Sequence, residues 1–104
     1  MSSVIVVGAG ITGLSLALGL VKLGFRVHLV ERRSDLRQRG GGTFLLQPNA
    51  IQALKEISPE AMTPLQDMGI SIPSNGKMYA WWMVRDALLF EVEKHHPNIQ
   101  LWLG

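Results

Sequence analysis

Apolar and polar residues alternate in blocks that predict a strand, a helix and a second strand in the first third of the chain. Residues 4–7 form a short β-branched block, which is typical of a strand buried on both faces. Residues 14–23 are rich in Leu and Ala and predict a helix that Gly24 ends. Residues 26–30 predict another strand, and Glu31 follows it directly. This order predicts a parallel βαβ unit.

The remainder of the chain predicts further helices and a third strand. Pro48 begins a helix with apolar residues on one face, and Ser58 is the expected N-cap of the next one. Turn residues predict a loop over residues 71–77. An apolar stripe over residues 84–92 predicts a helix, and residues 99–103 predict a strand. We therefore expect an α/β fold, a Rossmann-like domain with a small parallel sheet.

Three glycines at the junction of the first strand and helix have the spacing Gly-x-Gly-x-x-Gly. Gly8 permits a tight turn out of the strand, and Gly10 lacks the Cβ that would keep a pyrophosphate from the backbone. Gly13 lets the helix pack closely on the strand. Free N–H groups at the start of the helix would face the phosphates. The candidate pyrophosphate-binding residues are Gly8, Ala9, Gly10, Ile11, Thr12 and Gly13.

Glu31 adds the chemistry that distinguishes a dinucleotide site from an ordinary glycine-rich turn. It follows the second strand, where a carboxylate can accept hydrogen bonds from ribose hydroxyls. An acid in this place disfavours a 2′-phosphate, and therefore disfavours NADP in this pocket. Arg32 and Arg33 come next and could favour a 2′-phosphate instead, but an acid followed by Arg also suits an adenosine with free hydroxyls. On these residues alone, NAD and FAD both remain candidates.

The uncharged run over residues 4–21 also allows a membrane-spanning helix, which is a weaker interpretation. Its eighteen residues meet the lower length limit for a span. However, it contains four glycines, each of which costs about 1 kcal/mol of helix propensity. The run also divides into a β-branched block, residues 4–7, and a helical part that begins at residue 14. We therefore do not expect a membrane partner.

Composition and charge exclude several classes of function. A chain of 104 residues has room for one domain, and 47% hydrophobic with 17% charged residues excludes a disordered chain. The absence of Cys removes thiolate metal sites and Cys nucleophiles. A net charge of +2 is too small to indicate a nucleic-acid partner. His95 and His96 end a helix and complement its dipole, so we expect no metal site. Adjacent Trp81 and Trp82 are expected to be core or surface residues.

Together these residues resemble a known family of flavoproteins. Residues 4–31 look like the N-terminal FAD fingerprint of flavoproteins, and residues 39–50 are similar to the Arg/Gly-rich loop, strand and Pro-Asn helix start of class A (single-component) FAD-dependent aromatic-ring monooxygenases. That family includes salicylate, 6-hydroxynicotinate and urate hydroxylases and zeaxanthin epoxidase. Arg85-Asp86-x-Leu88 opening a helix resembles its third feature, an Arg that reaches the flavin. The positions in register with the fingerprint are Gly8, Gly10, Gly13, Ala17, Leu20, Gly24, Val27 and Glu31.

The resemblance implies an oxidoreductase that binds FAD. A complete enzyme of the family uses NAD(P)H and O2 to hydroxylate or epoxidise a small aromatic or polyene substrate. By the same resemblance, Arg39 and Arg85 would contact phosphate or ribityl oxygens of FAD. No general base or nucleophile is identifiable, so we predict no catalytic residue. We expect a cytoplasmic protein, and the sequence carries no signal for an oligomeric state.

The chain also departs from the family. No Asp-Gly or Gly-Asp dipeptide occurs in the sequence, whereas the family carries both in later motifs. We therefore expect residues 1–104 to be the N-terminal part of an FAD-binding domain that is incomplete and lacks the substrate domain. A noncatalytic, truncated dinucleotide-binding protein is the main alternative. A small membrane-anchored protein is the weaker one.

Overall fold

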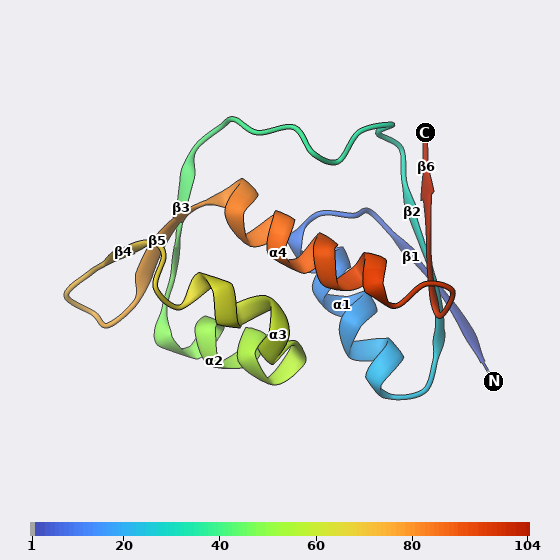
Figure 1. Cartoon of the computed structure of the whole chain (residues 1–104), viewed down its shortest axis with the longest axis horizontal. Coiled ribbons are helices and arrows are strands. Elements are labelled where there is room, and N and C mark those ends of the chain that lie inside the picture. The colour runs from blue at the N-terminus through green and yellow to red at the C-terminus, as the bar shows by residue number, and fades with distance from the viewer. Residues whose placement is uncertain (1) are drawn as a thin grey trace.

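Two three-stranded sheets lie at opposite ends of the molecule, with most of the helices between them (Figure 1). The computed structural model describes residues 2–104. The strands are β1 (Ser3–Val7), β2 (Arg26–Glu31), β3 (Thr43–Leu46), β4 (Ile70–Ser71), β5 (Lys77–Ala80) and β6 (Ile99–Leu103). The helices are α1 (Ile11–Lys22), α2 (Pro48–Ile57), α3 (Pro59–Met62) and α4 (Trp81–Lys94), with a 3₁₀ turn, η1 (Thr63–Leu65).

The parallel sheet has the strand order β1-β2-β6 and contains the expected βαβ unit. The helix α1 connects β1 to β2, and α4 leads into β6. Both right-handed crossovers move in the same direction along the sheet, so both helices cover the same face (Figure 1). This confirms the expected α/β fold with a small parallel sheet. The core between sheet and helices includes Val6, Leu14, Leu18, Val27, Leu29, Leu88, Val92 and Ile99.

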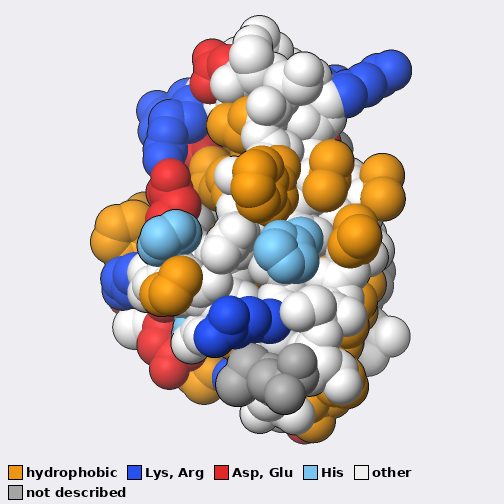
Figure 2. All heavy atoms as spheres, turned by 90° about the vertical axis from the view of Figure 1, so that its right-hand side faces the viewer, with side chains coloured by type: hydrophobic (Ala, Val, Ile, Leu, Met, Phe, Trp, Pro, Cys, Tyr) orange, Lys and Arg blue, Asp and Glu red, His pale blue; other side chains and the backbone are white. Residues whose placement is uncertain are grey.

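The prediction that the first strand is buried on both faces is wrong. In β1, Ile5 is 69% exposed and Val7 is 83% exposed. The reason is the one-sided arrangement of the helices: within residues 2–104 nothing covers the opposite face of the sheet. Figure 2 shows that face, on which apolar side chains and histidines gather. There Trp102 Nε1 donates a hydrogen bond to His28 Nδ1 at 3.2 Å.

The second sheet is antiparallel, with the strand order β3-β5-β4, and the sequence predicted only a loop over residues 71–77. The loop itself is shorter, residues 72–76, and closes a hairpin in which Asn75 has a φ of 68°. The flanking strands have two and four residues, which is too short for an alternating pattern to be seen. Tyr79 fixes this sheet to the helices, because its buried hydroxyl donates to the Leu65 carbonyl at 3.0 Å.

Helix boundaries follow the capping signals closely. Pro48 occupies the first turn of α2, and the Ser58 hydroxyl accepts a hydrogen bond from the Ala61 N–H at 3.2 Å, as expected of the N-cap of α3. Among the helices of residues 2–104, none combines the length and hydrophobicity of a bilayer-spanning segment.

We predict that Gly13→Ala destabilises the fold. A Cβ at this position would lie 1.8 Å from the Gly8 carbonyl oxygen, so α1 would have to move away from β1. We expect the free energy of unfolding to fall by about 1–3 kcal/mol or more. Gly19→Ala in the same helix is the matched control, because a Cβ there meets no atom within 4 Å. It should stabilise by up to about 1 kcal/mol. Urea unfolding measures both, and equal stability of the two variants would contradict the packing argument.

Candidate functional site

The turn between β1 and α1 is held tightly against the neighbouring strand. The Gly8 N–H donates to the Val30 carbonyl at 2.7 Å, and Gly8 has a φ of +101°, which a side chain would strain. Gly13 packs directly on the Gly8 carbonyl. The structure therefore supports the predicted packing roles of both glycines. The helix begins at Ile11, three residues earlier than the composition indicated.

The N-terminus of α1 carries free hydrogen-bond donors. Gly10 is its N-cap and provides no side-chain acceptor, and the first bond within the helix runs from the Leu14 N–H to the Gly10 carbonyl at 2.9 Å. The N–H groups of Ile11, Thr12 and Gly13 thus have no acceptor within the helix. A Cβ at Gly10 would meet no atom within 4 Å, so space for a ligand lies beside these donors. Such a helix end favours an anion.

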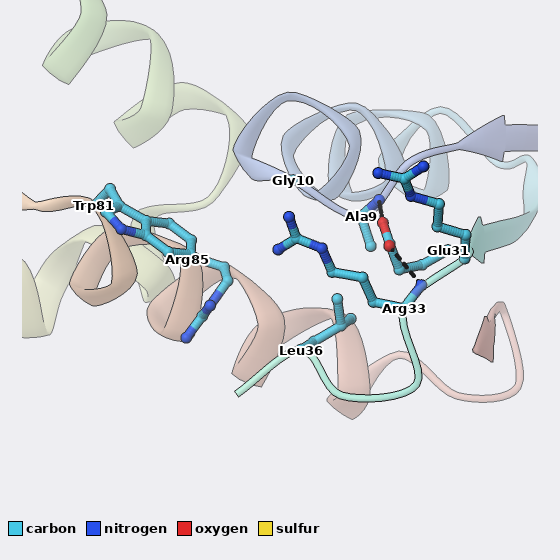
Figure 3. A pocket seen from close by; sticks show the side chains of 8 residues that line it. Ala9, Gly10, Glu31, Arg33, Leu36, Trp81 and Arg85 are labelled. Carbon is cyan, nitrogen blue, oxygen red and sulfur yellow. Dashed lines mark hydrogen bonds between the residues drawn. The ribbon is translucent and has the colours of Figure 1, made fainter. Parts of the chain in front are cut away.

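Glu31 closes the other side of the turn. Its Oε1 accepts a hydrogen bond from the Ala9 N–H at 3.0 Å, and its Oε2 accepts one from the Arg33 N–H at 2.8 Å (Figure 3). These two bonds hold the pKa of the Glu31 carboxyl below its usual range. The group is therefore ionised at neutral pH. Each oxygen keeps a lone pair with which it can accept a ribose hydroxyl.

These groups surround a hollow of about 250 Å³ (Figure 3). Its walls come from the glycine turn, the end of β2, the segment that follows it and the first turns of α4. A second hollow, of about 390 Å³, adjoins it at the carboxyl ends of the strands, shares Glu31 and Arg32, and has apolar walls that include Val30 and Trp102. The residues that line the first hollow are Ala9, Gly10, Glu31, Arg32, Arg33, Leu36, Trp81 and Arg85.

Arg85 borders the hollow but is already strongly bound to the protein. It is 3% exposed, and its Nη1 donates to the Gln38 carbonyl at 2.6 Å. Its Nε and Nη2 both donate to Asp86 Oδ1, at 3.1 and 2.8 Å. It lies in the second turn of α4 rather than opening that helix. Its guanidinium stacks 4.6 Å above the centre of the Trp81 ring.

Arg39 lies apart from the hollow. Its guanidinium stacks 4.3 Å above the Trp82 ring and forms an ion pair with Asp86 Oδ2 at 3.3 Å. These residues line a different groove, on the side of α4 that faces η1. The structure thus brings together Ala9, Gly10, Glu31, Arg32 and Arg85, with Ile11 and Thr12 beside them, but not Arg39. A contact between Arg39 and a cofactor stays a prediction.

Sequence reasoning missed three residues of the hollow. Trp81 was expected in the core or on the surface, yet it carries Arg85 on its ring, and its Nε1 donates to the Gly40 carbonyl. Its position four residues before Arg85 on one helix is the signal that places the two side chains on the same face. Leu36 and Arg33 carry no comparable signal beyond their closeness to Glu31.

Comparison with known proteins identifies the family. A family model described as FAD dependent oxidoreductase matches residues 3–95.

The chain belongs to the FAD-dependent oxidoreductase family.

The resemblance carried by the glycine turn and Glu31 is thereby confirmed. The FAD-dependent monooxygenase azaH of Aspergillus niger is 35% identical over 78 residues, which are 75% of this chain and 18% of that protein. The solved structure of FqzB matches with a TM-score of 0.83 and 21% identity, over 99% of this chain and 28% of that one. CtdE in complex with FAD matches with a TM-score of 0.81 and 20% identity, over 97% and 30%. The chain thus spans less than a third of each of these proteins.

For this family member we predict a pH-dependent loss of stability in Glu31→Gln. The lowered pKa means that the Glu31 carboxylate stabilises the fold above about pH 4.3, the pKa of an unfolded Glu, and that this stabilisation is lost as the pH falls through the folded-state pKa. The variant should lose about 0.5–1 kcal/mol at pH 7, because an amide replaces an ionised acceptor whose interactions solvent partly screens.

Urea unfolding at pH 7 and at pH 3.5 measures the difference, which should shrink at the lower pH. Glu56→Gln, on the exposed side of α2, is the control and should change little at either pH. A deficit of Glu31→Gln that is the same at both pH values would contradict the role given to the charge.

Proposed function

We propose that residues 1–104 form the N-terminal part of an FAD-binding domain and hold the ADP half of FAD in the hollow beside Gly10. One observation carries the proposal: the uncapped N-terminus of α1, the open space at Gly10 and the ionised Glu31 all face the same hollow. The first two suit a diphosphate, and the third suits ribose hydroxyls. The described residues therefore fit this part of the cofactor.

The size of the hollow agrees with a partial site. At about 250 Å³ it is slightly smaller than typical ligand pockets, which begin at about 300 Å³. It therefore suits a ribose and diphosphate rather than a whole dinucleotide. The adjoining apolar hollow, which shares Glu31 and Arg32, suits the adenine base. We assign Gly8, Ala9, Gly10, Ile11, Thr12 and Gly13 to the diphosphate turn, Glu31 and Arg32 to the adenosine, and Arg85 and Arg39 to the flavin side.

Family membership and the monooxygenase relative support FAD over NAD as the resident cofactor. FAD, when bound, would supply the redox chemistry with NAD(P)H and O2, while the protein binds and orients it. We propose that the complete protein hydroxylates or epoxidises a small aromatic or polyene substrate with NAD(P)H as co-substrate, and that it works in the cytoplasm. None of the described residues is given a catalytic role.

Gly10→Val tests the cofactor site directly. The added side chain meets no protein atom within 4 Å at its Cβ, so the fold should keep its stability within about 1 kcal/mol. It occupies the space that the diphosphate needs, so FAD affinity should fall by at least about tenfold. Glu31→Ala should also weaken FAD binding, through the ribose.

Titration of the purified chain with FAD, and separately with NAD, measures these effects, and thermal unfolding verifies that each variant is folded. Gly19→Val, on the same helix, is the control that leaves the hollow unchanged. Equal FAD affinity of the wild type and Gly10→Val, or tighter binding of NAD than of FAD, would contradict the proposal.

A further inference from the structure

We infer that Arg33 supplies the positive charge that faces the N-terminus of α1 across the hollow and selects ligands that carry a diphosphate. This inference rests on the proposed function of the site. The sequence predicts a solvated or pyrophosphate-facing loop for the arginines of residues 32–39 but does not single out Arg33. Figure 3 shows its guanidinium inside the hollow, pointing toward Gly10. A diphosphate at the start of α1 would therefore lie between the helix N–H groups and this cation.

The backbone of Arg33 is fixed on both sides. Its N–H donates to Glu31 Oε2 at 2.8 Å, and its carbonyl accepts from the Gly104 N–H at 3.1 Å. The first bond also links Arg33 to the carboxylate that is proposed to hold the ribose. The backbone position of Arg33 is therefore set before any ligand binds, and only its side chain has to adjust.

The guanidinium of Arg33, like that of Arg32, is available, in contrast to those of Arg37, Arg39 and Arg85. Within residues 2–104 it has no hydrogen-bond or ion-pair partner. Arg37 pairs with Glu93 through bonds of 2.7 Å, and Arg39 and Arg85 both contact Asp86. Arg37 thus has a carboxylate of its own, and Arg39 and Arg85 share one, so each of these guanidinium groups is already engaged by the protein. Arg32 and Arg33 are thus the two cations of this segment whose donors are left for an anion; Arg32 also lines the adjoining apolar hollow, whereas the Arg33 guanidinium points toward Gly10.

The electrostatics of the hollow favour such a cation. Glu31 is ionised and lies beside the space proposed for the diphosphate, which itself carries negative charge. A carboxylate and a diphosphate side by side repel each other, and the helix terminus supplies only partial positive charge. Arg33 offsets the repulsion. Because its guanidinium points toward Gly10, it faces the diphosphate side rather than a phosphate on the 2′ position.

The test compares ligands that share adenosine and differ in the diphosphate. The full chain, as wild type and as Arg33→Gln, is titrated with FAD, ADP and adenosine. We expect Arg33→Gln to weaken FAD and ADP roughly tenfold and to leave adenosine unchanged. Arg33→Lys, which keeps the charge, should recover part of the loss. Arg26→Gln is the matched control, because Arg26 is exposed at the other end of β2.

Salt provides a second measurement, independent of any small change in fold. The affinity of the wild type for ADP should fall with ionic strength more steeply than that of Arg33→Gln. Thermal unfolding verifies that all variants are folded.

The outcomes separate the two proposals. A wild type that binds neither FAD nor ADP overturns the proposed function, and the inference with it. A wild type that binds both, with an Arg33→Gln variant that binds ADP equally well, overturns the inference alone. An equal loss for adenosine and ADP also overturns it, because Arg33 would then act on the shape of the hollow. Tighter binding of 2′-phosphoadenosine than of ADP would overturn the inference as well, because Arg33 would then face a 2′-phosphate and not the diphosphate.

Discussion

The site depends on the contact between Gly13 of α1 and the carbonyl of Gly8 at the end of the turn that leaves β1. No other residue fits there, since any Cβ would overlap the carbonyl. The contact brings the first turn of the helix against the edge of the sheet, so its free N–H groups point into the hollow. Glu31 reaches the Ala9 N–H only because the turn is held this close to β2. The close packing of helix on strand is therefore also what places acid and donors side by side.

The one-sided sheet explains both where the hollow lies and what the strands expose. Both crossovers place their helices on the same face, and the carboxyl ends of β1 and β2 meet at one edge, where ligands bind in such sheets. The core needs only the residues that face α1 and α4, so the described chain leaves Ile5 and Val7 uncovered. A β-branched strand therefore need not be buried on both faces, even where the parallel fold is correct.

Much of the site could be predicted because its chemistry is local in the sequence. Gly8, Gly10 and Gly13 belong to one turn, and Glu31 has a fixed place at the end of the next strand, so spacing alone located them. Trp81, Leu36 and Arg33 could not be found in this way. Trp81 comes to the hollow from about fifty residues after Glu31, through a crossover whose length no motif fixes. The second sheet was missed for another reason: a strand of two residues is too short to show an alternation of apolar and polar side chains.

The wall contributed by α4 has a consequence for binding. The segment between β2 and β3 crosses the molecule with no regular structure (Figure 1), yet the first turns of α4 hold it in three places. The Trp81 N–H and Nε1 donate to the Gly42 and Gly40 carbonyls, and Arg85 donates to the Gln38 carbonyl. The stack of Arg85 on Trp81 joins these donors into one unit. A wall that is already fixed requires less ordering when a ligand binds, so more of the interaction energy with the diphosphate and ribose is available as affinity. The buried Arg85 therefore contributes to binding first by holding the segment that carries Arg33 and Leu36 against the helix.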